Sequence, residues 1–242
     1  MKSRNLTILA FCALAMTSSF ASREKGKKIK VSKDQFITEL MGKMTLDEKI
    51  GQLVLPDGHE ANTGVSEKTD IYGDIKKGLV GSVLNVSDPK AIRELQKVAV
   101  NESRLGIPLL VGLDVIHGFR TIFPIPLAQS CSWDTTLVRK AARIAAIEAS
   151  AYGVNWTYSP MVDVAHDARW GRIAEGNGED PFLSACMAKS LVYGYQEDMK
   201  KNTNIAACLK HYALYGAVES GLDYNFVDMS RIRMFNEYML PY

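Results

Sequence analysis

The sequence predicts an α/β fold organised around a parallel sheet. Short apolar strand patterns alternate with amphipathic helix patterns along most of the chain. The strand pattern at residues 107–113 is apolar on both faces, as a strand covered by helices on both sides must be. Polar segments directly follow three of the strand patterns, which is where parallel α/β folds place their chemistry.

The helices between the strand patterns have recognisable ends. Asp88 and Asp134 stand where N-caps are needed, Thr45–Glu48 has the form of a capping box, and Gly78 and Gly153 follow helix patterns as C-terminal stops. We expect strands at residues 52–55, 80–85, 107–113, 154–158 and 205–210, helices at residues 32–44, 71–77, 135–152 and 181–199, and further helices beginning at Thr45, Pro89 and Arg231.

Two architectures fit this alternation, a doubly wound sheet and a (β/α)8 barrel. Neither GxGxxG nor GxxxxGK[ST] follows a strand pattern, which removes the usual support for a nucleotide-binding doubly wound sheet. In a barrel, functional residues lie at the C-terminal strand ends, and Asp114, residues 163–180 and Lys210–His211 meet that condition. We therefore predict a TIM-like (β/α)8 barrel that is incomplete. A full barrel takes about 250 residues, which the chain without residues 1–21 nearly reaches, but only about five β/α units are present because long loops use up the residues.

The N-terminus predicts a secretory signal peptide at residues 1–21. Lys2 and Arg4 form a basic start, residues 6–16 are apolar, and Ser19-Phe20-Ala21 is a small-x-small cleavage signal. The apolar run is too short for a membrane span, so we expect a secreted or periplasmic protein with no membrane contact beyond this peptide. A lipoprotein anchored through Cys12 is the minor alternative, since Phe11 stands where a small residue is required.

Composition excludes several partners. The chain is 47% hydrophobic and 23% charged, an ordinary globular balance. Removing residues 1–21 takes away Lys2 and Arg4, so 29 basic against 27 acidic residues becomes 27 against 27, which predicts no binding to nucleic acid. Cys131, Cys186 and Cys208 are spaced like neither a disulfide framework nor a zinc site, so we expect buried, inert thiols and no metal or organic cofactor.

The stretch at residues 155–182 carries the densest chemistry. It passes from a strand pattern into a long polar segment that holds Arg169-Trp170-Gly171-Arg172. Two guanidinium groups three residues apart suit the recognition of oxygen-rich ligands. An equally weighted alternative is an arginine locked in an ion pair with Glu175, Glu179 or Asp180.

Six motifs occur in a fixed order along the chain: Gly106-Ile107-Pro108-Leu109-Leu110, Asp114-Val115-Ile116-His117-Gly118, Thr121-Ile122-Phe123-Pro124, Arg169-Trp170-Gly171-Arg172, Gly178-Glu179-Asp180-Pro181 and Lys210-His211-Tyr212. Together they resemble the N-terminal barrel domain of glycoside hydrolase family three, in its β-glucosidase branch. The resemblance covers residues 32–242, and we assign residues 22–242 to this domain. The run after Lys210-His211 lacks the Pro-Gly-His-Gly of the N-acetylglucosaminidase branch, which favours the glucosidase–xylosidase branch.

The resemblance implies a retaining, exo-acting hydrolase that releases terminal β-D-glucose from β-glucosides and short oligosaccharides. It also implies that Asp114, Arg172, Lys210 and His211 bind hydroxyls of the terminal sugar. The residue types agree with those roles, because a carboxylate accepts from two adjacent hydroxyls, Arg172 and Lys210 donate, and His211 can donate through one ring nitrogen. The expected partner is therefore a small carbohydrate.

Structural alternatives exist for these residues. Asp114 could simply form an ion pair with Lys210 or Arg172. His117 is expected to be a structural histidine bonded to backbone, and Trp170 is expected to pack beneath the arginine loop. Leu222 stands where the family commonly has a basic residue, which puts any contact from that side chain in doubt.

The resemblance places the nucleophile and the acid/base beyond Tyr242, so we expect neither within this chain. Residues 22–242 alone are then expected to bind sugar without glycosidase activity. An internal pair of Glu175 and Glu179 is disfavoured, because their loop matches a binding region and Glu179 precedes a helix start. The other hypotheses are a non-catalytic sugar-binding fragment, a β-xylosidase of the same family and, remotely, an aldolase that uses Lys210 as a Schiff base.

Overall fold

The computed structural model describes residues 32–58 and 70–242. The chain divides into two units, Met1–Gly42 and Lys43–Tyr242. The first contains α1 (Lys33–Lys43) apart from its last residue, close to the helix predicted at residues 32–44. The expected signal peptide lies outside the described residues. Everything that follows concerns the second unit.

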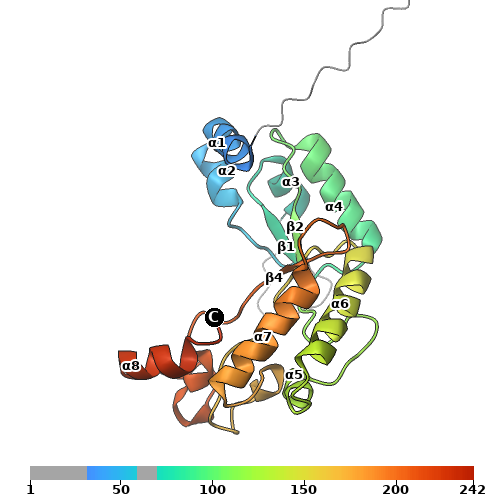
Figure 1. Ribbon diagram of the computed structural model, residues 1–242. Helices are drawn as coiled ribbons and strands as arrows, with labels where there is room; N and C mark the ends of the chain where they lie inside the picture. The colour runs from blue at the N-terminus through green and yellow to red at the C-terminus, as the bar shows by residue number, and fades with distance from the viewer. Residues whose placement is uncertain (1–31, 59–69) are drawn as a thin grey trace, which may run out of the picture. The chain divides into compact units, whose positions relative to one another are not determined.

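The second unit is built around a sheet of parallel strands (Figure 1). The strands β1 (Ser82–Leu84), β2 (Leu110–Leu113), β3 (Trp156–Thr157) and β4 (Ala206–Ala207) lie side by side in sequence order. The register pairs Ser82 with Leu110, Gly112 with Trp156, and Trp156 with Ala206. A doubly wound sheet reverses its strand order at a switch point, and this sheet does not within the described residues. The fold is the incomplete TIM-like barrel predicted from the sequence.

Helices connect the strands and cover the sheet. Their bounds are α2 (Leu46–Gly51), α3 (Ile71–Lys76), α4 (Pro89–Glu102), α5 (Pro126–Ser130), α6 (Thr135–Ala151), α7 (Pro181–Gln196) and α8 (Arg231–Arg233), which Met234–Tyr238 continues as a π-helical turn. The predicted caps are confirmed: Thr45 and Glu48 form a capping box, and the Asp88 and Asp134 carboxylates accept backbone N–H groups of α4 and α6. The short helix α5 was not predicted, since five residues are too few to show a helical period.

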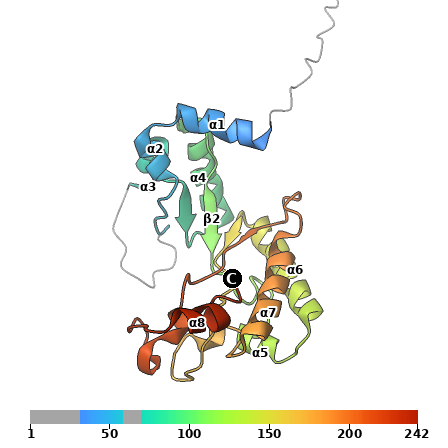
Figure 2. The same ribbon diagram turned by 60° about the vertical axis from the view of Figure 1, so that its left-hand side comes forward.

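The main core lies between the strands and the helices α4, α6 and α7. Val83, Val111 and Ile205 of the sheet region are fully buried, in the same apolar cluster as small residues of α6 such as Ala146. The helices α6 and α7 lie side by side in both views (Figures 1 and 2). Gly194 permits this, because a Cβ there would lie 2.5 Å from the Cβ of Ala142.

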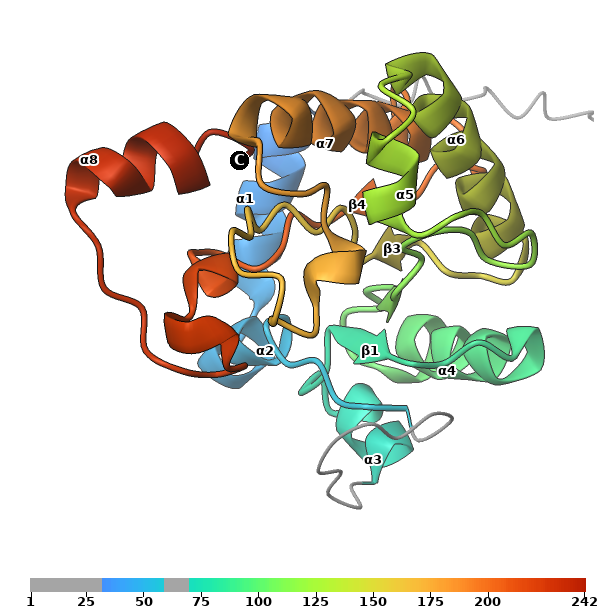
Figure 3. The same ribbon diagram turned by 90° about the horizontal axis from the view of Figure 1, so that it is seen from below.

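A second, smaller core lies under the loop that follows β3. Its buried members are Met161, Ala165, Trp170 and Val218, which come from the loops after β3 and after β4. In Figure 3 the loop after β3, drawn in gold, lies beside β3 and β4. The long polar segment singled out in the sequence is therefore a packed structure with its own apolar centre.

The strand predicted at residues 52–55 is wrong. Gln52 caps α2, and the N–H groups of Leu53 and Val54 donate to the carbonyls of Ile50 and Gly51, so the helix end uses these backbone groups. Pairing with β1 occurs further on, where an isolated bridge joins Asp57 to Leu84. The apolar run at residues 52–55 has no strand period to separate it from a helix end.

The expectation of buried cysteines is also wrong in part. Cys131 is exposed, and Cys186 and Cys208 are half-buried free thiols. Cys131 follows α5, the helix that the sequence analysis did not find, so its surroundings could not be predicted. None of the helices in the described ranges is long and apolar enough to span a bilayer.

Candidate functional site

The four residues predicted from the sequence line one cavity. Asp114 follows β2 directly, Arg172 lies in the loop after β3, and Lys210 and His211 follow β4. The cavity has a volume of about 550 Å³, and its other lining residues are Leu55, Leu84, Ile116, Tyr158 and Glu175. Three consecutive strands thus deliver polar side chains from their C-terminal ends to one place, as barrel geometry predicts.

The loops that carry these side chains are tied to one another by backbone hydrogen bonds. An isolated parallel bridge joins Met161 to Lys210, beyond the last residues of β3 and β4. The N–H of Val162 donates to the carbonyl of Lys210 at 2.8 Å, and the N–H of Lys210 donates to Pro160 at 3.2 Å. Lys210 and His211 therefore occupy a fixed register relative to the loop after β3.

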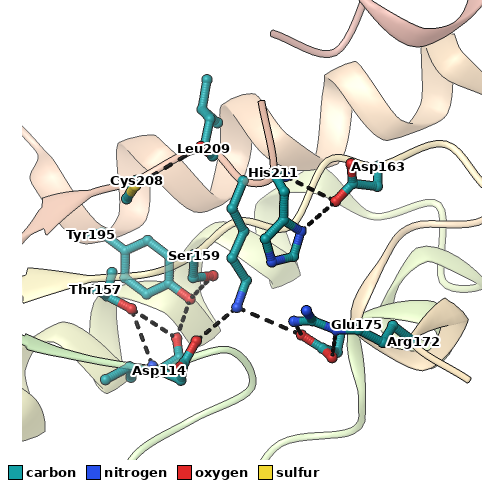
Figure 4. A network of polar contacts seen from close by, with 12 residues as sticks. Asp114, Thr157, Ser159, Asp163, Arg172, Glu175, Tyr195, Cys208, Leu209 and His211 are labelled. Carbon is teal, nitrogen blue, oxygen red and sulfur yellow. Dashed lines mark hydrogen bonds and ion pairs between the residues drawn. The ribbon is translucent and has the colours of Figure 1, made fainter. Parts of the chain in front are cut away.

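Asp114 is positioned by the residue that follows it. The N–H of Val115 donates to Thr157 Oγ1 at 3.1 Å, and the carbonyl of Val115 accepts from the Tyr195 hydroxyl at 2.8 Å. Tyr195 lies in α7 and is 1% exposed. Strand β3 and helix α7 together fix the backbone at the end of β2, so the Asp114 side chain leaves the sheet in a defined direction (Figure 4).

Lys210 joins two carboxylates across the cavity. Its Nζ lies 2.7 Å from Asp114 Oδ1 and 3.6 Å from Glu175 Oε2. The alternative in which Asp114 pairs with Lys210 is therefore realised. The ion pair leaves further hydrogen-bonding positions on both Lys210 and Asp114, because an ammonium has three N–H donors and a carboxylate has about four acceptor positions. The Asp114 side chain is 46% exposed, which leaves its carboxylate accessible from the cavity.

Arg172 is held by Glu175 in a bidentate ion pair. Nε lies 2.7 Å from Oε1 and Nη2 lies 2.8 Å from Oε2 (Figure 4). The ring of Tyr215 lies 5.6 Å from the guanidinium carbon, which adds a cation–π contact. Of the two possibilities left open for Arg172, a ligand contact and an ion pair, the ion pair is present, and Arg172 also lines the cavity.

These contacts keep Glu175 ionised. Burial raises the pKa of Glu175, but the hydrogen bonds and charge of Arg172, with the charge of Lys210, outweigh it and leave the pKa below its usual range. The same hydrogen bonds, which Arg172 donates to Glu175, raise the pKa of the Arg172 guanidinium. Glu175 is thus a fixed anion that orients two cations.

His211 is held from its own backbone and from its ring. Asp163 Oδ2 accepts the His211 N–H at 2.9 Å and lies 2.8 Å from ring atom Nδ1. The Tyr242 hydroxyl donates to the His211 carbonyl at 2.7 Å, and the ring of Tyr215 packs edge-on against the imidazole at 4.9 Å. The imidazole therefore has a single supported orientation.

The structure also shows the surroundings of His117, Trp170 and Arg169, for which expectations were drawn from the sequence. His117 is structural, with Nδ1 3.1 Å from the carbonyl of Phe123. Trp170 packs under the arginine loop, is 1% exposed and donates its indole N–H to Asp223 at 2.9 Å. Arg169 pairs with Asp167 on the surface and is not a lining residue of the cavity.

The contributions of Asp163, Tyr158 and Tyr215 were not predicted from the sequence. Asp163 is 4% exposed and lies three residues after a proline at the end of β3, and a lone acid beside a strand end was a usable signal. Tyr158 lines the cavity, and Gly112 makes room for it, since a Cβ at Gly112 would overlap the Tyr158 ring. Tyr215 gave no signal, because its role depends on contacts between loops.

The chemistry of the cavity suits a small, neutral, hydroxyl-rich ligand. Arg172 and Lys210 offer N–H donors, Asp114 offers acceptors, and Leu55, Leu84 and Ile116 offer apolar surface. Over residues 32–58 and 70–242, no three His, Cys, Asp or Glu side chains are grouped so that they could hold a metal ion.

Comparison with known proteins identifies relatives of the whole second unit. The sequence model of the glycosyl hydrolase family 3 N terminal domain matches residues 45–242. The periplasmic beta-glucosidase of Salmonella typhimurium is 44% identical over 212 residues, which are 87% of this chain and 27% of that protein. A beta-xylosidase of Formosa agariphila is 31% identical over 195 residues, 75% of this chain and 27% of that protein.

Solved structures agree with the sequence comparison. The beta-glucosidase of Listeria innocua in complex with isofagomine superimposes with a TM-score of 0.80 at 41% identity, over 88% of this chain and 30% of that one. The same enzyme in complex with glucose gives 0.78 at 40% identity, over 87% and 31%. The chain therefore spans less than a third of the length of these relatives.

Proposed function

Because the chain belongs to glycosyl hydrolase family 3 through its N-terminal domain, we propose that its cavity binds the terminal glucose of β-glucosides and short oligosaccharides. The activity proposed for the protein is the retaining, exo-acting release of β-D-glucose. The observation that carries this proposal is the convergence of Asp114, Arg172, Lys210 and His211 on one cavity of about 550 Å³. Relatives named as beta-glucosidases, one of them crystallised with glucose, support the choice of sugar.

The roles proposed for the four residues follow from their donors and acceptors. A pyranose presents adjacent hydroxyls, each of which is both donor and acceptor. Asp114 accepts from hydroxyl protons, while the N–H groups of Arg172 and Lys210 that are not used in ion pairs donate to hydroxyl oxygens. Glu175 holds those two cations in place without itself being the ligand contact. Hydrogen bonds to charged groups contribute about 1.5–3 kcal/mol each.

The test is the affinity for glucose measured by calorimetry. We expect Asp114→Ala to weaken binding by one to two powers of ten, as the loss of a charged hydrogen-bond acceptor predicts. Asp167→Ala is the matched control, because Asp167 is paired with Arg169 outside the cavity. Glucose affinity that is the same in all three proteins, or no binding to the unaltered protein, would overturn the proposal.

A β-xylosidase is the second candidate, favoured by the 31% identity to the beta-xylosidase of Formosa agariphila. Xylose differs from glucose by the missing hydroxymethyl group. Competition between glucose and xylose for the same cavity decides between the two. At least ten-fold tighter binding of glucose supports the glucosidase, and equal or reversed affinities support the xylosidase.

The proposed location is the periplasm or the exterior of the cell. Relatives named as periplasmic, from Salmonella typhimurium and Dickeya chrysanthemi, support this choice together with the signal-peptide pattern at residues 1–21. The proposed cleavage follows Ala21. N-terminal sequencing of the protein recovered from expressing cells tests it, and a retained Met1 would contradict it.

A further inference from the structure

Asp163 contacts the ring of His211 and is not itself a lining residue of the cavity. We propose that Asp163 is a positioning residue that fixes the tautomer of His211, so that the nitrogen facing the cavity accepts a hydrogen bond from a ligand hydroxyl. This inference rests on the proposed function for the identity of the ligand, but the tautomer itself can be tested without any ligand.

The geometry leaves Asp163 committed to His211. Its Oδ2 accepts the backbone N–H at 2.9 Å and faces ring Nδ1 at 2.8 Å. Its other oxygen, Oδ1, is buried and has no hydrogen-bond partner among the described residues. The side chain is 1% exposed, so water does not compete for the carboxylate. A buried carboxylate without a second partner is directed entirely at this one histidine.

The direction of the ring hydrogen bond follows from the chemistry of the partners. An ionised carboxylate only accepts, so the short contact at Nδ1 requires the proton on that nitrogen. In the neutral ring, Nε2 then carries a lone pair and no proton. Figure 4 shows this second nitrogen pointing away from Asp163, toward the side where Asp114 and Arg172 lie.

Two other contacts support this orientation of the ring and of its backbone. The edge of the Tyr215 ring packs against the imidazole at 4.9 Å, and the His211 carbonyl is held by the Tyr242 hydroxyl at 2.7 Å. His211 therefore adds an acceptor to the cavity, where a charged imidazolium or the opposite tautomer would add a donor. This revises the sequence-based expectation that His211 donates to the sugar.

An unprotonated Nε2 restricts which group the sugar can present at the position that faces His211. A hydroxyl facing Nε2 must donate its proton, and a fluorine atom in its place cannot. Where hydroxyls face Arg172 or Lys210, a fluorine can still accept weakly. The cavity thus distinguishes ring positions by the direction of the hydrogen bond.

The first experiment records ¹⁵N spectra of the histidine rings in the full chain at about pH 8, with His211→Gln to assign the His211 signals. We expect one protonated nitrogen, Nδ1, and an unprotonated Nε2. His117 is an internal reference, because its Nδ1 faces a backbone carbonyl at 3.1 Å and does not contact Asp163. A His211 ring protonated at Nε2, whether alone or together with Nδ1, overturns the inference.

The second experiment compares substitutions at Asp163. Asp163→Asn keeps an acceptor oxygen and is expected to keep the Nδ1-protonated form, whereas Asp163→Ala is expected to give a mixture of tautomers with unchanged His117 signals. Asp167→Asn, in the same loop, is the matched control and should change nothing. If Asp163→Ala leaves the tautomer as in the unaltered protein, Asp163 is not what fixes it. If that variant does not fold, the spectra of the unaltered protein still decide.

The third experiment measures the affinity of glucose and of its single deoxy and deoxyfluoro analogues. We expect Asp163→Ala to weaken glucose binding about ten-fold and Asp163→Asn to restore most of it. In the unaltered protein, the analogue with fluorine in place of the hydroxyl that faces Nε2 should bind more weakly than glucose. In Asp163→Ala this difference in affinity should be smaller. A fluoro and deoxy pattern identical in the unaltered protein and the alanine variant overturns the inference. Absence of glucose binding overturns the proposed function, while the spectra still report on Asp163.

Discussion

At the scale of single residues, the ion pairs in the cavity fix the direction in which hydrogen-bond donors such as the Arg172 guanidinium point. Arg172 is fixed by two parallel hydrogen bonds to Glu175 and by the face of Tyr215. A lysine carries the same charge but cannot form the planar fork or stack in the same way. The orientation of the donors, beyond their charge, is therefore what substitution should disturb.

We predict that Arg172→Lys lowers the affinity for glucose about ten-fold, since it loses one charged hydrogen bond worth about 1.5 kcal/mol. The measurement is calorimetric titration with glucose. Arg169→Lys is the matched control, because Arg169 lies three residues earlier in the same loop and pairs with Asp167 at the surface. Equal affinities in the two variants would mean that Arg172 supplies charge alone or does not touch the ligand.

The residues of the cavity were predictable to different degrees. Asp114, Arg172, Lys210 and His211 each stand at or after the end of a strand pattern, and barrel geometry brings such positions together. Glu175, Asp163 and Tyr215 act on these four through space, and the partners lie up to 48 residues apart in the case of Asp163 and His211. A single sequence records which groups are present but not which carboxylate faces which cation.

At the scale of elements, the close crossing of α6 and α7 sets the position of the loop that α7 follows. Gly194 lies where α7 meets α6, and a Cβ there would lie 2.5 Å from both the Ala142 Cβ and the carbonyl oxygen of Arg139. Alanine normally stabilises a helix relative to glycine by up to about 1 kcal/mol. Overpacking a well-filled contact costs about 1–3 kcal/mol, so the steric cost should dominate here.

We predict that Gly194→Ala lowers the free energy of unfolding by about 1–2 kcal/mol, measured by urea denaturation followed by circular dichroism. Gly171→Ala is the control, since a Cβ at Gly171 meets no atom within 4 Å among the described residues. Should Gly194→Ala be as stable as the control or more so, the two helices can separate without cost.

The junction between α2 and the end of α4 should respond to acid. Glu48 closes the capping box of α2 and accepts from Arg104 Nε at 2.9 Å, and it is 6% exposed. The hydrogen bond from Arg104, followed by that from the Thr45 N–H, lowers the pKa of Glu48 to about 2. Since the folded-state pKa lies below the unfolded value of about 4.3, ionised Glu48 stabilises the fold fully above that value and loses its effect as pH falls toward about 2.

We predict that Glu48→Gln lowers the Tm at about pH 7 and that the gap to the unaltered protein closes as pH falls from about 5 to about 2. Glutamine keeps an acceptor for the cap, so the pH dependence isolates the charge. Glu94→Gln is the control, because Glu94 is exposed on α4 and faces exposed Lys97 at 3.6 Å. A gap that does not change with pH would show that the ionised form of Glu48 has no special role.

The elements themselves were largely predictable because local chemistry marks their ends. Asp88, Asp134 and the Thr45–Glu48 box each satisfy backbone N–H groups at a helix start, and these signals depend on neighbouring residues alone. The failure at residues 52–55 has the opposite cause. Whether a four-residue apolar run pairs as a strand or ends a helix depends on what lies across from it.

At the scale of the whole molecule, binding and hydrolysis make different demands on this chain. Retaining hydrolysis needs two carboxyl groups about 5–5.5 Å apart, one acting as nucleophile and one donating a proton. The carboxylates that line the cavity are Asp114 and Glu175, and the ammonium of Lys210 lies between them at 2.7 and 3.6 Å. A proton donor needs a raised pKa, whereas Arg172 and its neighbours hold the pKa of Glu175 below its usual range.

We therefore predict that the 242-residue chain binds glucose and releases no nitrophenol from a nitrophenyl β-glucoside above the uncatalysed rate. Both measurements are needed, because a misfolded chain would neither bind glucose nor release nitrophenol. Asp114→Ala should weaken glucose binding by one to two powers of ten and leave the release of nitrophenol unchanged. If the chain does hydrolyse the glucoside, Glu175→Gln becomes the decisive variant. Loss of that activity with glucose affinity unchanged would make Glu175 a catalytic group, and retained activity would place the reacting carboxylates outside the cavity described for residues 32–58 and 70–242.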